Sequence, residues 1–455
     1  MLPRKTLLSV TLFAVLMFAL RQVPGMDWLR PPDGGTLAAI LHPPEPPAAT
    51  PAAAPPTEPA KPVQTAKTVR DTSRPDVVSA PGRPRITDPV GAMDSFYRAL
   101  RALEAGQAAR NVRILHYGDS PTTADSITGD VRRLLQTRYG DGGHGFLLTG
   151  QPWAWYGHHG VSLKARGWTI QRASEVDRSR DALHGLGGVT FSGYPGAFSE
   201  AKLPGGHRHV DIHFLNQPGG GTFQVKAGDT AVLEQATAGE SKSPGFVQGV
   251  LPPGSDTVRI TVTQGRVRLL GWTFEKDAPG LVYSSIGLNG ASVQTLVNYF
   301  EESHWAAQLR HQEPALVVLN YGSNESVNAA YVDKYYAQEL RKLIRRVQYA
   351  VPQASILIMS PMDRGERNQR GEIVTVPTVP RIVEIQQQTA LELGCAFFST
   401  FAAMGGPGTM AQWYAAKPKL VAADFLHPTP GGAAKIGAML DEAIRESYGR
   451  WKAKQ

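Results

Sequence analysis

The sequence predicts an α/β fold with a parallel sheet, interrupted by an inserted β-rich module. The first observation is an apolar run, a glycine turn and an amphipathic segment over residues 112–139, which is the signature of an α/β unit. The second is an apolar run at 315–319 that ends in a glycine turn, and a probable strand and helix within 281–297 that are separated by further glycines. The third is a stretch of alternating polar and apolar residues between these parts, at 160–276.

Residues 1–29 are typical of an export signal or a short membrane anchor. Arg4 and Lys5 precede an apolar segment over 7–20. About 14 apolar residues are short for a membrane span, and no clear A-x-A site follows, so a cleaved signal peptide and an uncleaved anchor both stay open. Residues 30–87 are rich in Pro and Ala, which predicts a disordered linker. We therefore expect an exported protein of the bacterial envelope, located in the periplasm, whose N-terminal segment contacts the membrane.

Charge and cysteine content exclude several classes of function. The formal net charge is +8, but the basic residues are scattered and no Lys/Arg block with interleaved aromatic residues is present, so we predict no nucleic-acid partner. Cys395 is the one cysteine, which rules out an internal disulfide bond. Its apolar neighbours raise a thiol pKa, which argues against a nucleophilic role.

Residues 88–159 are predicted to begin the folded part, with a helix that starts near Asp94 and a strand at 112–118. Gly118, Asp119 and Ser120 follow this strand directly. A serine at the first helical turn, just past the carboxyl end of a strand, lies where open α/β sheets bind ligands and where a hydroxyl nucleophile is exposed. The alternative is that the three residues form only a turn and a helix cap.

Asp424 and His427 are three residues apart, directly before a predicted helix. In a turn, this spacing brings the carboxylate to the imidazole, which would fix the ring tautomer and leave the other nitrogen to accept a serine proton. The chain order Ser, Asp, His is compatible with a catalytic triad. The alternative is a capping aspartate beside a surface histidine.

Two further glycine turns follow predicted strands. The strand over 315–319 ends in Gly322 and Asn324, and the amide of Asn324 could donate a hydrogen bond to a developing oxyanion. The alternative is a turn asparagine in a left-handed conformation. Within 281–297, Gly287, Asn289 and Gly290 lie between a probable strand and a helix, and Gly290 could offer an unobstructed backbone amide.

The ordered set of Gly118-Asp119-Ser120, Gly290, Gly322-x-Asn324 and Asp424-x-x-His427 resembles the SGNH (GDSL) hydrolase superfamily. The resemblance implies a three-layer α/β/α sandwich and a serine esterase that needs no cofactor and no metal. It also implies roles for single residues: Ser120 is the nucleophile, His427 the base and Asp424 its orienting partner. The oxyanion hole would consist of the backbone amides of Ser120 and Gly290 and the side chain of Asn324.

The resemblance covers roughly residues 90–150 and 281–450, and two positions depart from the family pattern. Pro121 stands in place of the leucine of the GDSL motif. Glu325 stands where many members have aspartate, so the role of this carboxylate is left open.

Residues 160–276 are predicted to form an inserted β-sandwich, like a jelly roll, between two parts of the hydrolase domain at 88–159 and 277–455. This arrangement is similar to the peptidoglycan O-acetylesterases, with a β-module that resembles carbohydrate-binding folds. We therefore expect an esterase that removes O-acetyl groups from an envelope polysaccharide, with peptidoglycan as first choice. The alternatives are an O-acetyltransferase with the same triad, a lipase or thioesterase, and a glycan-binding protein with an inert hydrolase scaffold.

Aromatic residues near the end of the first hydrolase part could contact a sugar. Trp153, Trp155 and Tyr156 offer flat rings for this, although core packing would use the same residues.

A run of histidines, His207, His209 and His213, falls on one face of a predicted strand, and such spacing can bind zinc. No fourth ligand is evident in the sequence. We therefore expect solvated strand histidines and no metal.

Overall fold

The structure is a computed structural model that describes residues 82–455. The expectations for residues 1–29 and for most of the linker lie outside the described residues. Within residues 82–455, no helix is long and apolar enough to cross a membrane.

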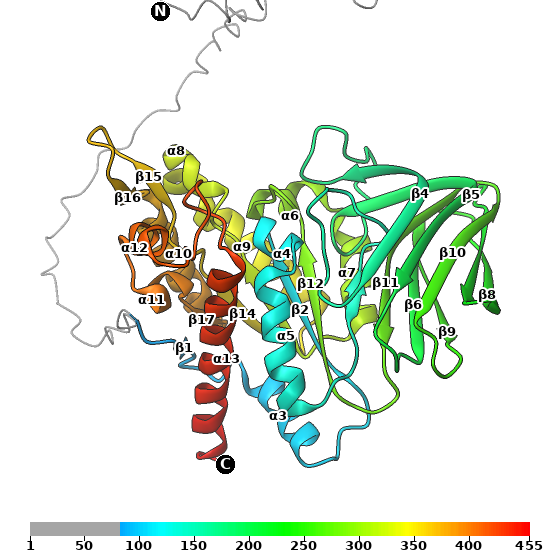
Figure 1. The fold of residues 1–455 in the computed structure, drawn as a ribbon, viewed down its shortest axis with the longest axis horizontal. Coiled ribbons are helices and arrows are strands. Elements are labelled where there is room, and N and C mark those ends of the chain that lie inside the picture. Colours follow the sequence, from blue (N-terminus) through cyan, green and yellow to red (C-terminus); the bar gives the residue numbers. More distant parts are fainter. Residues whose placement is uncertain (1–81) are drawn as a thin grey trace, which may run out of the picture. The chain divides into compact units, whose positions relative to one another are not determined.

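Six strands form a mainly parallel sheet (Figure 1). In spatial order they are β1 (Ile86–Thr87), β17 (Ala396–Phe398), β14 (Ser355–Met359), β13 (Leu316–Asn320), β2 (Val112–Gly118) and β12 (Leu281–Gly287). All neighbours pair in parallel except β1, which pairs antiparallel with β17 at the edge. The chain passes from β2 outward to β12 and then returns to the other side of β2 with β13. In such sheets, ligands bind at the carboxyl ends of the strands where this reversal occurs.

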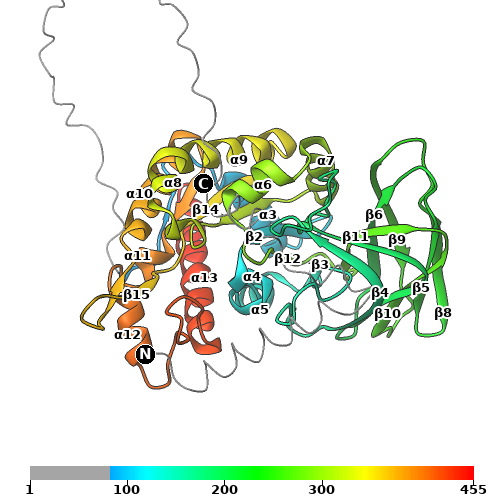
Figure 2. The ribbon, with the colours of Figure 1, turned by 90° about the horizontal axis from the view of Figure 1, so that it is seen from above.

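Helices cover both faces of this sheet. The helices are α3 (Asp94–Glu104), α4 (Ser120–Thr123), α5 (Ser126–Tyr139), α6 (Val293–Tyr299), α7 (Glu302–Gln312), α8 (Ala329–Tyr331), α9 (Ala337–Ala350), α10 (Thr378–Glu392), α11 (Thr400–Met404), α12 (Thr409–Ala415) and α13 (Pro430–Lys452), with short turns η2 (Glu325–Val327) and η3 (Val332–Tyr336). Figure 2 shows α5 and α13 on one side of the sheet and α6, α7 and α9 on the other.

Alternation along the strands explains why both faces are covered. In β2, the side chain of Ile114 packs in the core that includes α3, α5 and α13, whereas Leu115 and Tyr117 pack in the core that includes α6, α7, α9 and α10. The three-layer α/β/α arrangement agrees with the prediction. Cys395 lies buried in the second core, where burial raises the pKa of its thiol to about 12.

Helix α5 follows the predicted pattern closely. Ile127, Val131 and Leu135 are buried on one face, and the helix ends at Tyr139, directly before Gly140, which has a φ of 90°. It begins at Ser126 because Asp125 adopts a left-handed conformation with a φ of 53°, which separates α5 from the short helix α4.

The segment between the two hydrolase parts contributes to a second, antiparallel sheet of nine strands (Figure 1). The strands are β3 (Gly145–Leu147), β4 (Ser162–Arg172), β5 (Val189–Lys202), β6 (His209–Asn216), β7 (Thr222–Ala227), β8 (Thr230–Ala236), β9 (Ser243–Val250), β10 (Thr257–Gln264) and β11 (Val267–Glu275). A separate hairpin consists of β15 (Gly365–Arg367) and β16 (Ile373–Thr375).

In place of the predicted β-sandwich, the structure has one continuous sheet. This sheet nearly closes on itself, because its end strands β8 and β9 contact each other. Strand β5 explains the continuity. It pairs with β4 along one edge, and along the other edge its two halves pair with β10 and β11. Alternating apolar residues predict the strands and their inward faces, but they do not specify which strands pair.

Strand β3 connects the two sheets. It pairs with β11 in the nine-stranded sheet and also contacts β12, the edge strand of the parallel sheet. β3 precedes residue 160, so the nine-stranded sheet includes a strand from the segment predicted to belong to the hydrolase domain. The boundaries at residues 160 and 276 stay a prediction.

Candidate active site

Ser120 is the first residue of α4 and lies at the carboxyl end of β2, the strand at which the sheet order reverses. The turn before it is tight. A Cβ atom added to Gly118 would lie 2.2 Å from Oγ1 of Thr122, so only glycine fits there. On the neighbouring strand, a Cβ atom on Gly287 would lie 2.0 Å from the backbone nitrogen of Thr123, so α4 sits directly against β12.

The structure brings Ser120, His427 and Asp424 into one hydrogen-bonded chain. Oγ of Ser120 lies 2.8 Å from Nε2 of His427, and Nδ1 of His427 lies 2.6 Å from Oδ2 of Asp424. Oδ1 of Asp424 accepts hydrogen bonds from the backbone amides of Leu426 and His427, both at 3.1 Å. Burial opposes ionisation of Asp424, but these hydrogen bonds outweigh it and lower the pKa of the carboxyl below its ordinary value. The ionised carboxylate therefore accepts a hydrogen bond from Nδ1–H of His427, which leaves Nε2 free to accept a proton from Ser120.

The loop that carries Asp424 and His427 is fixed from several sides. The amide of Ala422 donates to the carbonyl of His427 at 2.8 Å, and the amide of Gly365 in β15 donates to the carbonyl of Phe425 at 2.9 Å. The Phe425 side chain is buried, and its ring meets that of Tyr414 edge to face. The hairpin of β15 and β16 and helix α12 thus hold the imidazole in position.

The loops after β12 and β13 meet the turn that carries Ser120. Nδ2 of Asn324 donates to the carbonyl of Ala291 at 2.7 Å and to Oδ2 of Asp119 at 3.4 Å. Asn324 therefore contacts the neighbour of Gly290 on one side and the neighbour of Ser120 on the other. Gly290 is exposed and has a φ of 69°, a conformation that favours glycine.

Glu325 links two of these loops, a role that the sequence left open. Its Oε1 accepts a hydrogen bond from the amide of Val293 at 2.8 Å, and its Oε2 accepts one from the amide of Gly322 at 3.0 Å. The carboxyl group is buried, and burial raises its pKa to about 7. Burial, together with the charge of Glu325, likewise raises the pKa of Asp119 to about 7.

Arg364 is a site residue that the sequence reasoning missed. Its Nη1 donates to the carbonyl of Ser323 at 2.8 Å and to Oγ of Ser326 at 3.2 Å, next to Asn324. The following residue, Gly365, holds the loop of His427. Arg364 follows the apolar strand β14 at its carboxyl end, so the signal that identified the other loops was present here too.

The three candidate sugar-contacting residues differ in exposure. Trp153 is buried, and its Nε1 donates to Glu175 at 2.9 Å, while Tyr156 is buried and its hydroxyl accepts from the amide of Leu148 at 2.9 Å. Their rings are therefore used for packing rather than for a binding surface. Trp155 is 55% exposed. It lies two residues before Gly157, whose amide donates to the carbonyl of Thr123 in α4 at 3.3 Å.

The prediction of solvated strand histidines is wrong for two of the three residues. His207 is buried, and its Nε2 lies 3.0 Å from Nδ1 of His144. His209 is exposed and contacts Asp277 at 2.7 Å. His213 is fully buried against other elements. The spacing placed these residues along one strand, but the partners that cover two of them come from distant parts of the chain.

The family model of the GDSL-like lipase/acylhydrolase family matches residues 254–435. The matched range contains Gly290, Asn324, Asp424 and His427. It begins after Ser120, but the fold places Ser120 within hydrogen-bond distance of His427. This range is therefore similar to the GDSL-like acylhydrolases. The protein is a carboxylic ester hydrolase, as the sequence predicts.

One of the similar solved structures shares the overall fold. A peptidoglycan O-acetylesterase superposes with a TM-score of 0.70 at 21% identity, over 80% of this chain and 99% of that one. A family two carbohydrate esterase from Clostridium thermocellum in complex with cellohexaose gives a TM-score of 0.29 at 12% identity, over 63% of this chain and 99% of that one. An acetylxylan esterase from Geobacillus stearothermophilus gives a TM-score of 0.28 at 20% identity, over 37% and 73%. No curated protein matches the sequence.

Proposed function

We propose that the protein removes O-acetyl groups from a polysaccharide of the bacterial envelope, and that this polysaccharide is peptidoglycan. The observation that carries the proposal is the hydrogen-bonded chain from Oγ of Ser120 through His427 to Asp424, with distances of 2.8 and 2.6 Å. This is the arrangement that converts a weakly nucleophilic hydroxyl into one able to attack an ester.

In the first half of the reaction, Oγ of Ser120 attacks the carbonyl carbon of the acetyl group while Nε2 of His427 takes the hydroxyl proton. The carboxylate of Asp424 stabilises the imidazolium that forms. The C–O bond to the sugar then breaks, and His427 returns the proton to the departing sugar oxygen. The product of this step is an acetylated Ser120 and a free sugar hydroxyl.

In the second half, a water molecule attacks the acetyl-enzyme with His427 again as base, which releases acetate and restores Ser120. The side chains of His427 and Asp424 are 42% and 50% exposed, so solvent reaches the base directly. This exposure favours hydrolysis over transfer of the acetyl group to a second sugar. The negative oxygen formed in both halves would be stabilised by the amides of Ser120 and Gly290 and by the Asn324 side chain.

Two observations support a polysaccharide substrate. The first is the shared fold with a protein described as a peptidoglycan O-acetylesterase, which covers nearly all of that chain. The second is the exposed ring of Trp155 beside α4, which we propose stacks on a sugar ring near the ester. We further propose that the inserted module at 160–276 binds carbohydrate.

The decisive experiment compares acetate release by the wild type and by Ser120→Ala on native and on de-O-acetylated peptidoglycan. We expect acetate only from the wild type on native material, with unchanged circular dichroism for the variant. Delivery of acetyl groups to unmodified glycan would instead indicate an O-acetyltransferase. Glycan retention without acetate release would indicate a binding protein, and a preference for long-chain nitrophenyl esters would indicate a lipase or thioesterase.

We also propose that the protein is exported and works in the periplasm, tethered by its N-terminal segment. The support is the basic and apolar sequence of residues 1–29 followed by the Pro/Ala-rich residues to 87. Fractionation of cells that express the full chain tests this proposal. Recovery of the protein in the cytoplasmic fraction would contradict it.

A further inference from the structure

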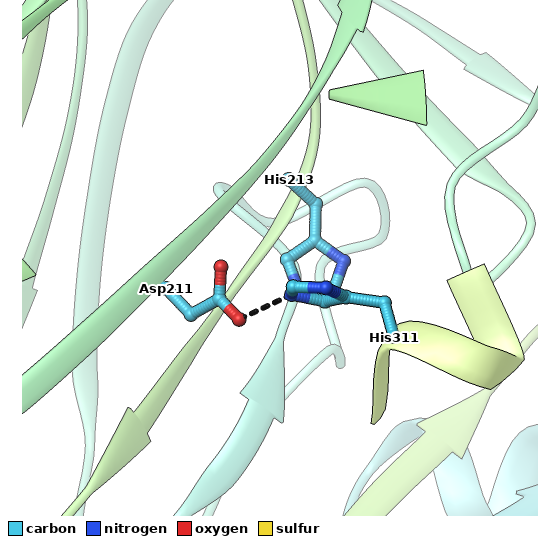
Figure 3. Close-up of side chains that lie close together, drawn as sticks. All are labelled: Asp211, His213 and His311. Atoms are coloured by element: carbon cyan, nitrogen blue, oxygen red, sulfur yellow. Dashed lines mark hydrogen bonds and ion pairs between the residues drawn. The ribbon is translucent and has the colours of Figure 1, made fainter. Parts of the chain in front are cut away.

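A cluster of metal-ligating side chains lies where β6 contacts the end of α7 (Figure 3). Asp211 and His213 are two residues apart on β6 and face the same side of the strand, and His311 comes from the last turn of α7. Figure 3 shows the three side chains pointing toward one another. One ligand atom from each residue lies within 4.8 Å of the other two. Nε2 of His311 lies 2.5 Å from Oδ2 of Asp211.

The cluster contains buried polar atoms for which the protein supplies no partner. Within residues 82–455, Oδ1 of Asp211, Nδ1 of His213 and Oε1 of Gln312 are buried without a hydrogen bond. Two of these atoms are oxygens that only accept hydrogen bonds. Buried polar atoms in native proteins are almost always satisfied, and an ion is one of the groups that satisfies such a set.

The two imidazole rings are held in fixed orientations. The His311 ring stacks on Phe246 of β9 at 3.7 Å between centroids and an angle of 7°. The His213 ring is buried, and it meets the ring of Phe246 and that of His311 edge to face. Fixed rings lose little conformational entropy when they bind a ligand.

We propose that Asp211, His213 and His311 bind one divalent transition-metal cation of the class represented by Zn²⁺. Two imidazole nitrogens and a carboxylate oxygen are ligands that Zn²⁺ commonly takes. The adjoining cavity, of about 500 Å³, is lined by Asp211, His311 and Gln248 and leaves room for water as a fourth ligand. Arg113 also lines this cavity, but its guanidinium is paired with Glu275 at 2.5 and 2.8 Å, so its positive charge is already compensated.

The position of the cluster assigns the cation a structural role. Helix α7 leads into β13, and the amide of Ala315 donates to the carbonyl of Arg113, near the amino end of β2. Ser120 follows the opposite end of the same strand, which at about 3.3 Å per residue is roughly 20 Å away. The cation would therefore join β6 of the nine-stranded sheet to α7 of the hydrolase part without reaching the ester.

The test uses the full chain after treatment with a chelator and dialysis. Zinc content is measured by elemental analysis after addition of Zn²⁺ and gel filtration, and the unfolding midpoint is measured with and without Zn²⁺. We expect one zinc per chain and a rise of about 2–4 °C in the midpoint at a large excess over the dissociation constant. His311→Gln, whose side chain is 22% exposed and therefore tolerant of replacement, should lose both effects. Release of acetate should not change on chelation.

His209→Gln is the matched control, because His209 lies on the same strand but is exposed and paired with Asp277. This variant should bind one zinc like the wild type. Absence of stoichiometric zinc in the wild type overturns the proposal. Equal zinc content and equal midpoint shifts in the wild type and in His311→Gln also overturn it. If His311→Gln does not fold, Asp211→Asn replaces it, and the same outcomes apply.

Discussion

Replacing Glu325 by glutamine should change how the stability of the protein depends on pH. The two oxygens of Glu325 accept hydrogen bonds from the amides of Val293 and Gly322, and these bonds hold together the loops after β12 and β13. Glutamine retains one acceptor oxygen and presents an NH₂ group to the other amide. A buried amide left without an acceptor costs about 1–3 kcal/mol, which is the expected loss of stability at low pH.

The magnitude of the pH effect follows from the pKa of Glu325, which burial raises from 4.5 to about 7. Below pH 4.5 the group is protonated in both the folded and the unfolded state. Between pH 4.5 and 7 the folded state keeps a proton that the unfolded state has released, so the contribution of Glu325 to the free energy of unfolding falls as pH rises. The full loss, about 3 kcal/mol, is reached above pH 7. Glutamine does not titrate and has no such loss. Its substitution also removes the charge that helps to raise the pKa of Asp119, which acts in the same direction.

The assay is urea unfolding of the wild type and of Glu325→Gln at several pH values from 4.5 to 8. We expect the variant to be less stable at pH 4.5 and the difference to shrink or reverse by pH 8. The control is Glu240→Gln, an exposed residue of the nine-stranded part, which should track the wild type. A stability difference between the wild type and Glu325→Gln that stays constant over this range would refute the reasoning.

Three further substitutions test the site. Asp424→Asn should lower kcat/KM on nitrophenyl acetate by about 10²–10⁴, because the amide no longer fixes the tautomer of His427, and a loss under tenfold would contradict the orienting role. Arg364→Ala should lower kcat more than it raises KM, because it releases the loop of Asn324. Arg364→Lys should restore part of the lost kcat. If both variants instead lower stability equally and leave kcat unchanged, Arg364 has only a structural role. Trp155→Ala should raise KM on peptidoglycan and leave kinetics on nitrophenyl acetate unchanged, whereas equal losses on both substrates would exclude a sugar contact.

Much of the hydrolase fold could be predicted because its elements have local patterns. The apolar run before Gly118 and the apolar positions of α5 predict a strand and a helix with the observed bounds to within about two residues. The pairing of strands could not be predicted in the same way. The antiparallel edge strand β1 and the near closure of the nine-stranded sheet depend on contacts between segments far apart in the chain.

The candidate site was predictable because parallel strands end at one edge of a sheet. Residues that follow β2, β12 and β13 must meet there, so weak motifs in the correct order become informative together. The contacts that hold these loops in place could not be predicted from the sequence in the same way. Arg364 looks like any polar residue after a strand, and the pairing of the Glu325 oxygens with two specific amides depends on how the loops pack.

Histidines on β6 show where sequence spacing stops being sufficient. Spacing of two along a strand places side chains on one face, and it therefore grouped His209 and His213. The residues that meet His213 are Asp211, from the same face, and His311, from a helix almost a hundred residues later. A strand can supply two ligands from its own pattern, but a third ligand requires a second element whose rotation is set by core packing. The proposed cation would therefore stabilise the orientation in which α7 packs against β6.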